Sequence, residues 1–312
     1  RRHTRLAILS RGLGDVYKRQ NPSCKVTATS SPNSWRSPLN FPKTTRTSVA
    51  LTTSIDLENT MTTQTLTQLR QLKLGGMADV LQTQLEQVGT YEDLPFIERL
   101  GLLLDQENLT RDQRKQQRLI RQARFKLRAS VQEIDYQHPR NITRSQIAQL
   151  AQGDWIHRAH NLLMTGPCGS GKTYLACALG DQACRHGYSV RYYRLSRLLL
   201  ELTQAKADGS YHKQLKLLAI IQLLIIDDWG LETLQAAHRN DLMEIMDDRH
   251  GSTSTLVNSQ LPTDQWYASI GDNTLADAIL DRLMHNAHRL PLKGESMRKQ
   301  MGQLTEDEHL GA

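Results

Sequence analysis

The segment Gly166–Thr173 constrains the fold more than any other part of this chain. It reads Gly-Pro-Cys-Gly-Ser-Gly-Lys-Thr, follows a short apolar run at residues 161–165, and precedes a helical pattern that continues through Ala183. Strand, glycine-rich loop and helix in this order are typical of a phosphate-binding loop, where backbone N–H groups and the positive end of the helix converge on phosphate oxygens. An ordinary glycine turn is the alternative, and the flanking strand and helix disfavour it.

The whole loop is predicted to bind the phosphates of a nucleotide. The glycines let the backbone curl, Lys172 neutralises the outer phosphates, and the Thr173 hydroxyl ligates magnesium. Cys168 is interpreted as a small filler whose alkylation would obstruct the nucleotide. The predicted nucleotide-binding residues are Gly166, Pro167, Cys168, Gly169, Ser170, Gly171, Lys172 and Thr173.

A second motif lies at residues 223–228, Leu-Leu-Ile-Ile-Asp-Asp. Four consecutive apolar residues suit a strand that is buried on both faces of a parallel sheet. We expect Asp227 to hold magnesium through water and Asp228 to orient or deprotonate an attacking water. The alternative is that both acids only cap the following turn.

Further strands and helices alternate around these motifs. The strand at residues 223–228 is the third in chain order. One strand, at residues 188–194, lies between it and the strand that precedes the loop. The sequence therefore predicts an α/β fold with a five-stranded parallel sheet. The additional strands are expected at residues 188–194, 253–260 and 288–293, and helices at 196–206 and 274–285.

The strand at residues 253–260 ends in polar residues. Ligands of parallel sheets gather at the carboxyl ends of the strands. Asn258 is therefore expected to hydrogen-bond a γ-phosphate or the lytic water, with Ser259 and Gln260 as alternatives.

The region before the sheet shows helical periodicity. Apolar residues from 66 to 88 recur three and four apart, which predicts one helix, or two that are broken at Gly75-Gly76. A further helix is expected from Pro95, and another from Thr110, where Gln113 completes a capping-box pattern. We interpret residues 61–130 as a small all-helical domain.

The helix expected from Thr110 is strongly basic: residues 111–128 contain eight Lys or Arg and a single acid, Asp112. Basic residues three or four apart share one helix face and could follow DNA phosphates by releasing counterions. A solvated face that pairs with acids of another domain is the alternative. The predicted DNA contacts are Arg111, Arg114, Lys115, Arg118 and Arg121.

The first sixty residues differ from the rest. They carry ten Lys or Arg against three acids, which accounts for the whole formal charge of +7. Ser, Thr, Pro and Asn make up 23 of the 40 residues from 21 to 60. Such a segment buries too little apolar area to offset its ordering entropy. We expect translation to start at Met61, the first methionine, and interpret residues 1–60 as a disordered or artefactual leader; a transit peptide is the alternative.

The four cysteines show no CxxC or Cys/His metal spacing. Cys24 lies in the leader, and three remaining thiols cannot make a disulfide framework, so a cytoplasmic location is predicted. No apolar run approaches the roughly 18 residues that span a bilayer, and we expect a soluble protein without membrane contact.

Several motifs together carry a family resemblance. The chain from Met61 to about Gln300 resembles the IstB-like ATP-binding proteins of insertion sequences, which are similar to DnaC-type helicase loaders within the AAA+ ATPases. The resemblance places an AAA+ domain at residues 131–300 and a tail at 301–312. The segments that carry it are Gly166–Thr173, Leu223–Gly230, Asn258–Pro262, Asp281–Leu283 and Gly294–Arg298.

The resemblance implies an ATPase that uses ATP and Mg²⁺, assembles on duplex DNA, and recruits and activates a partner transposase. It matches Asn258 to the first sensor and Arg282 to an arginine finger, which would act on a neighbouring copy and so implies a homo-oligomer. For Arg282 the alternative is a salt bridge with Asp277 or Asp281.

This sequence departs from the family at three points. Position 228 is Asp where many AAA+ enzymes have Glu, position 258 is Asn where we expect Thr, and only fourteen residues follow Arg298, too few for a helical lid.

A replicative helicase loader is the alternative function. A small-molecule kinase would need an arginine-rich lid, and a GTPase would need an Asn-Lys-x-Asp motif, which the chain lacks.

Overall fold

The computed structural model describes residues 48–294 and 296, with side chains from Thr60 onward. The chain divides into two units, residues 1–60 and 61–312. The predictions for residues 1–47 and for the tail at 301–312 lie outside the described residues, as does Arg298 of the segment that carries the resemblance. Helix α1 begins at Ser48. Residues 48–60 of the segment interpreted as a leader therefore lie in a helix, and they contain no Pro or Gly to interrupt it.

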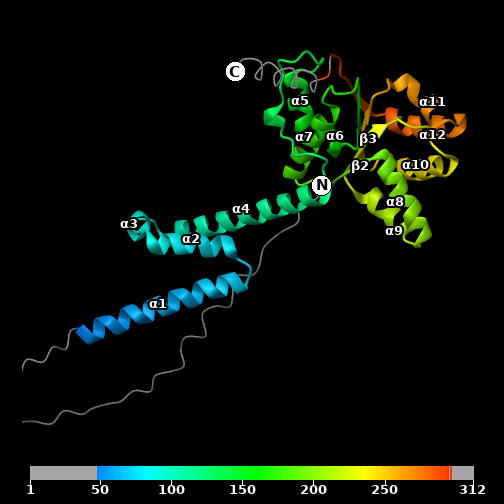
Figure 1. Ribbon diagram of the computed structural model, residues 1–312. Coiled ribbons are helices and arrows are strands. Elements are labelled where there is room, and N and C mark those ends of the chain that lie inside the picture. The colour runs from blue at the N-terminus through cyan, green and yellow to red at the C-terminus, as the bar shows by residue number, and fades with distance from the viewer. Residues whose placement is uncertain (1–47, 295, 297–312) are drawn as a thin grey trace, which may run out of the picture. The chain divides into compact units, whose positions relative to one another are not determined.

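The described residues form twelve α-helices and five strands, drawn in Figure 1, besides two short 3₁₀ turns. No helix among them is both long and apolar enough to cross a membrane. The helices are α1 Ser48–Gln71, α2 Gly75–Glu86, α3 Val88–Tyr91, α4 Phe96–Ala123, α5 Arg144–Ala151, α6 Asp154–His157, α7 Lys172–Arg185, α8 Leu195–Ala207, α9 Tyr211–Ile220, α10 Ala236–Arg249, α11 Trp266–Ile270 and α12 Asn273–Met284. The strands are β1 Asn161–Thr165, β2 Val190–Arg194, β3 Leu223–Trp229, β4 Ser254–Ser259 and β5 Ala287–Pro291.

Helices α1 and α2 are separate, as one of the two sequence alternatives proposed. The break precedes the glycine pair, at Lys73, which has a left-handed φ of 61°. Gly75 and Gly76 then open α2. A β-carbon on Gly76 would lie 2.8 Å from the carbonyl oxygen of Gln106, so the absence of a side chain lets α2 approach α4 closely.

Helix α4 is a single helix, and the separate helices predicted from Pro95 and Thr110 are wrong. Nothing between the two predicted segments is a helix breaker, so the chain continues through them. The Thr110 hydroxyl donates to the carbonyl oxygen of Gln106 at 2.8 Å, a bond within the helix and not a cap. The helix ends where Arg124 takes a left-handed φ of 56°.

The five strands form one parallel sheet in the order β2-β3-β4-β1-β5, which confirms the predicted fold class. Strand β4, late in the chain, lies between the loop strand β1 and the carboxylate strand β3. Alternate residues of each strand point to opposite faces. One face packs with α7 in a core that includes Met164 and Ile225, and the other packs with α8 and α12 in a core that includes Leu163 and Ile226.

Helices α9 and α10 were not expected from the sequence. In α10 the buried face contains Arg249, which is only 2% exposed. Its guanidinium donates to the Thr255 hydroxyl at 3.0 Å and to the carbonyl oxygen of Ile221 at 2.8 Å. A charged residue on the buried face interrupts the three-and-four spacing of apolar residues on which a helix prediction depends.

Candidate functional site

The glycine-rich loop connects the end of β1 to the start of α7. Gly169 and Gly171 adopt left-handed φ values of 81° and 89°, which favour glycine. The Lys172 ammonium donates to the carbonyl oxygens of Gly166 at 2.6 Å and Pro167 at 2.8 Å. Desolvation lowers the pKa of Lys172, which nearby acidic groups partly oppose. The loop backbone therefore curls at its glycines, and the Lys172 ammonium lies against the carbonyl oxygens at the start of the loop.

The carboxylate of Asp227 lies beside this loop and is 2% exposed. Its Oδ2 accepts hydrogen bonds from the Thr173 hydroxyl at 2.8 Å and from the Tyr192 hydroxyl at 2.6 Å. Its Oδ1 accepts from the backbone N–H of Asp228 at 3.0 Å. Burial, and then the hydrogen bond to Asp227, raise the pKa of Tyr192.

The second carboxylate, Asp228, has a left-handed φ of 62°. Its Oδ2 accepts from Arg194 Nε at 2.8 Å. This hydrogen bond, strengthened by the charge of Asp228, raises the pKa of Arg194. Neither Arg194 nor Tyr192 was predicted as a site residue. A signal for Arg194 was present, because it ends a strand predicted from the sequence and the carboxyl ends of parallel strands share one edge.

Asn258 is fully buried, and both its amide nitrogen and its amide oxygen are without a hydrogen-bond partner. An unpaired buried amide is costly, which suggests that a ligand or a water completes it. The Ser259 hydroxyl, by contrast, donates to the carbonyl oxygen of Trp229 at 2.8 Å and accepts from the N–H of Leu261 at 3.0 Å. Of these two candidates, Asn258 is the one with free polar atoms.

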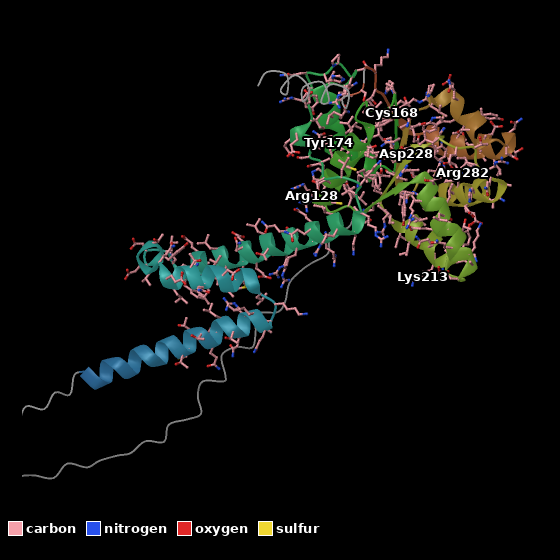
Figure 2. The ribbon with its side chains drawn as sticks, viewed as in Figure 1. Arg128, Cys168, Tyr174, Lys213, Asp228 and Arg282 are labelled. Carbon is pink, nitrogen blue, oxygen red and sulfur yellow. The ribbon has the colours of Figure 1, made fainter. Side chains whose placement is uncertain are left out.

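A cavity of about 800 Å³ brings these groups together, a volume suited to a small-molecule ligand. Both carboxylates and the polar end of β4 line it together with part of the loop, whose lining residues are Cys168, Gly169, Gly171, Lys172 and Thr173. Of the predicted nucleotide-binding residues, Gly166, Pro167 and Ser170 are not in this lining. Figure 2 labels Cys168 of the loop, Tyr174 of α7 and Asp228 of β3, which all line this cavity.

The cavity also has a wall that the sequence analysis did not assign to the site. This wall belongs to the chain after α4. The Tyr174 hydroxyl donates to Glu133 Oε2 at 3.3 Å, which ties this segment to α7. The wall residues of the segment are Lys126, Leu127, Glu133, Asp135 and Arg140.

The donor set suits Mg²⁺. The Thr173 hydroxyl and the Asp227 carboxylate are hard oxygen donors only 2.8 Å apart, at the wall of the cavity. Magnesium in nucleotide sites typically uses one or two protein oxygens and keeps waters and phosphate oxygens for its other positions. Thr173 could therefore ligate the ion, and Asp227 could hold it through water.

Arg282 lies elsewhere, on α12, and is not among the described residues that line the cavity. Its Nε donates to Asp247 Oδ1 of α10 at 2.8 Å, and another guanidinium nitrogen donates to the carbonyl oxygen of Ala278 at 3.0 Å. Figure 2 shows it on the side of the sheet where α10 and α12 pack. The acid that pairs with Arg282 is on a neighbouring helix, whereas the sequence alternative had proposed Asp277 or Asp281.

The five basic residues of α4 that were predicted to contact DNA are exposed. One is already paired: Arg111 Nε lies 2.7 Å from Glu107 Oε1. The other carboxylate oxygen of Glu107 accepts from the N–H of Gly76 at 2.8 Å, at the start of α2. The hydrogen bond from Arg111, with the backbone N–H groups, holds the pKa of Glu107 below its usual range against the opposing effect of burial. Arg111 therefore has a structural partner within the helical region.

Comparison with known proteins agrees with this geometry. A family model described as IstB-like ATP binding protein matches residues 67–305. The putative insertion sequence ATP-binding protein y4pL of Sinorhizobium fredii is 46% identical over 235 residues, which cover 75% of this chain and 96% of that protein. The insertion sequence IS1162 putative ATP-binding protein of Pseudomonas fluorescens is 50% identical over 204 residues, covering 65% of this chain and 88% of that protein.

Solved structures are similar at lower identity. The DnaC helicase loader superposes with a TM-score of 0.44 at 20% identity, covering 53% of this chain and 97% of that one. AMPPCP-bound DnaA from Aquifex aeolicus gives a TM-score of 0.47 at 13% identity, covering 59% of this chain and 56% of that one.

Proposed function

Because the chain belongs to the IstB-like ATP-binding proteins and is an AAA+ ATPase of that family, we propose that it assembles on duplex DNA in an ATP-dependent manner during transposition and recruits and activates a partner transposase. The observation that carries the nucleotide part is the 800 Å³ cavity where the loop, Asp227 and the unpaired amide of Asn258 meet. The transposition part is supported by relatives that are described as insertion sequence proteins.

Each group at the cavity has a role in this proposal. Lys172 and the loop N–H groups bind the phosphates, and Thr173 and Asp227 hold Mg²⁺, which would neutralise phosphate charge. Asn258 donates its amide to the γ-phosphate or to the lytic water. Asp228 orients that water. For this role its carboxylate must give up the hydrogen bond to Arg194 or share it with the water.

Arg282 completes the site of a neighbouring copy in this proposal. Arg282 is not among the described residues that line the cavity of its own chain, so in this proposal it acts on ATP bound to a neighbouring copy, and within its own chain its guanidinium pairs with Asp247. Changing Arg282 to Ala should leave ATP binding unchanged and suppress hydrolysis. Normal hydrolysis by this variant would refute the shared site.

The central experiment measures ATP-dependent binding to duplex DNA. Changing Lys172 to Ala should abolish nucleotide binding and nucleotide-dependent assembly, because the loop loses its only lysine. Changing both Arg118 and Arg121 to Glu should weaken DNA binding while nucleotide binding persists. If that double variant binds DNA as the unchanged chain does, the role given to α4 is wrong.

The partner can be identified separately. The helper role predicts that the adjacent gene encodes a transposase, and that purified transposase is retained by the ATP-bound protein on DNA. Retention of a replicative helicase in place of the transposase would support the helicase-loader alternative.

A further inference from the structure

Strand β2 contributes a residue whose contacts reach the proposed magnesium site. Tyr192 pairs with Ile225 of β3 in the sheet and is 7% exposed. Its side chain belongs to the core on the α7 face of the sheet. From there its hydroxyl donates to Asp227 Oδ2 at 2.6 Å, so a residue of the core contacts the carboxylate that lines the cavity.

The hydrogen bonds around Asp227 fix its carboxylate from three directions. Thr173 donates from the loop, the N–H of Asp228 donates from the next residue of the chain, and Tyr192 donates from the adjacent strand. Thr173 is itself a proposed magnesium ligand, so its contact with Asp227 must accommodate the ion. The Tyr192 contact comes from strand β2, and Tyr192 is not among the described residues that line the cavity, so this hydrogen bond does not have to change when the ion binds.

The neighbouring tyrosine shows that this contact does not follow from packing alone. Tyr193 is also buried, but it belongs to the core on the opposite face of the sheet, and its hydroxyl accepts from Gln214 Nε2 at 3.4 Å. Both tyrosines fill a core with an aromatic ring, and only Tyr192 directs its hydroxyl at Asp227. A phenylalanine would fill the same space without the hydroxyl.

We propose that Tyr192 is a positioning residue for the magnesium site: its hydroxyl holds the Asp227 carboxylate in the orientation that binds Mg²⁺ together with ATP. This inference rests on the proposed function of the cavity. Groups that hydrogen-bond a metal ligand from behind fix its orientation, and their loss typically weakens metal binding about tenfold to a hundredfold. Tyr192 makes no contact with the nucleotide in this role and acts only through Asp227.

The test compares Tyr192→Phe with Tyr193→Phe in the full chain. ATP affinity is first measured in EDTA, and Mn²⁺ binding to the ATP-loaded protein is then followed by electron paramagnetic resonance, with Mg²⁺ as competitor. For Tyr192→Phe we expect unchanged ATP affinity in EDTA and Mn²⁺ and Mg²⁺ affinities that fall about tenfold or more. Tyr193→Phe should match the unchanged chain in both measurements.

Three results would overturn the inference. In the first, Tyr192→Phe binds Mn²⁺ and Mg²⁺ as tightly as the unchanged chain does. In the second, both variants lose metal affinity equally. In the third, Tyr192→Phe loses ATP binding in EDTA, which would indicate damage to the fold. If the unchanged chain itself binds no ATP with Mn²⁺, the proposed function of the cavity fails instead. The two failures are therefore distinguishable.

Discussion

The salt dependence of DNA binding gives the sharpest test of the basic face of α4. Each phosphate that a protein neutralises on B-DNA contributes about −0.9 to the slope of log K against log salt concentration. Of the five predicted contacts, Arg111 is paired with Glu107, which leaves Arg114, Lys115, Arg118 and Arg121. If each of these four binds one phosphate, α4 contributes about −3.6 to the slope per chain.

Changing Arg118 and Arg121 to Gln should therefore reduce the magnitude of that slope by about 1.8. The measurement is fluorescence anisotropy of a labelled duplex, titrated with the ATP-bound protein at several salt concentrations. The matched control changes Arg158 and Arg289 to Gln, which removes the same charge from exposed positions outside α4. An equal decrease in both double variants, or no decrease in the α4 variant, would refute phosphate contact by this helix.

Three further predictions concern the nucleotide site and the helical region. Because burial raises the pKa of Cys177, and raises that of Cys184 to about 12, N-ethylmaleimide should modify exposed Cys168 before either, and ATP should protect it, as read by peptide mass spectrometry. Changing Asn258 to Ala should lower kcat for ATP hydrolysis about a hundredfold while ATP affinity persists, since one transition-state donor is lost; a kcat within a fewfold of the unchanged chain would remove Asn258 from the mechanism. Changing Glu107 to Ala should destabilise the packing of α2 on α4 by about 1.5–3 kcal/mol, the value of a hydrogen bond to a charged group, measured by hydrogen exchange of the α2 amides. Since the folded pKa of Glu107 lies below its ordinary value of 4.5, this stabilisation is complete above that pH and should be lost as pH falls through the lower folded pKa; the Ala variant should lack that pH dependence.

The amino-acid sequence alone determined the parts of the site that depend on contiguous residues. The loop at Gly166–Thr173 was predictable because its glycines and the flanking strand and helix specify the backbone path locally. The carboxylate strand was predictable because an unbroken apolar run marks a strand buried on both faces, and its acids necessarily follow at the carboxyl end. That the polar end of the strand at residues 254–259 lies at the cavity was predictable for the same reason, but the sequence did not choose among Asn258, Ser259 and Gln260.

Only the tertiary structure decided which residues surround those motifs. Strand β4 lies between β1 and β3 through pairing of segments distant in the chain, which places Asn258 at the cavity with the loop and Asp227. Tyr192 and Arg194 reach the two carboxylates because β2 pairs with β3, a register that no local pattern specifies. The polar partners of such residues, like those of buried Arg249, come from elements far away in sequence, and their hydrogen bonds form only when the whole sheet and its two cores are packed.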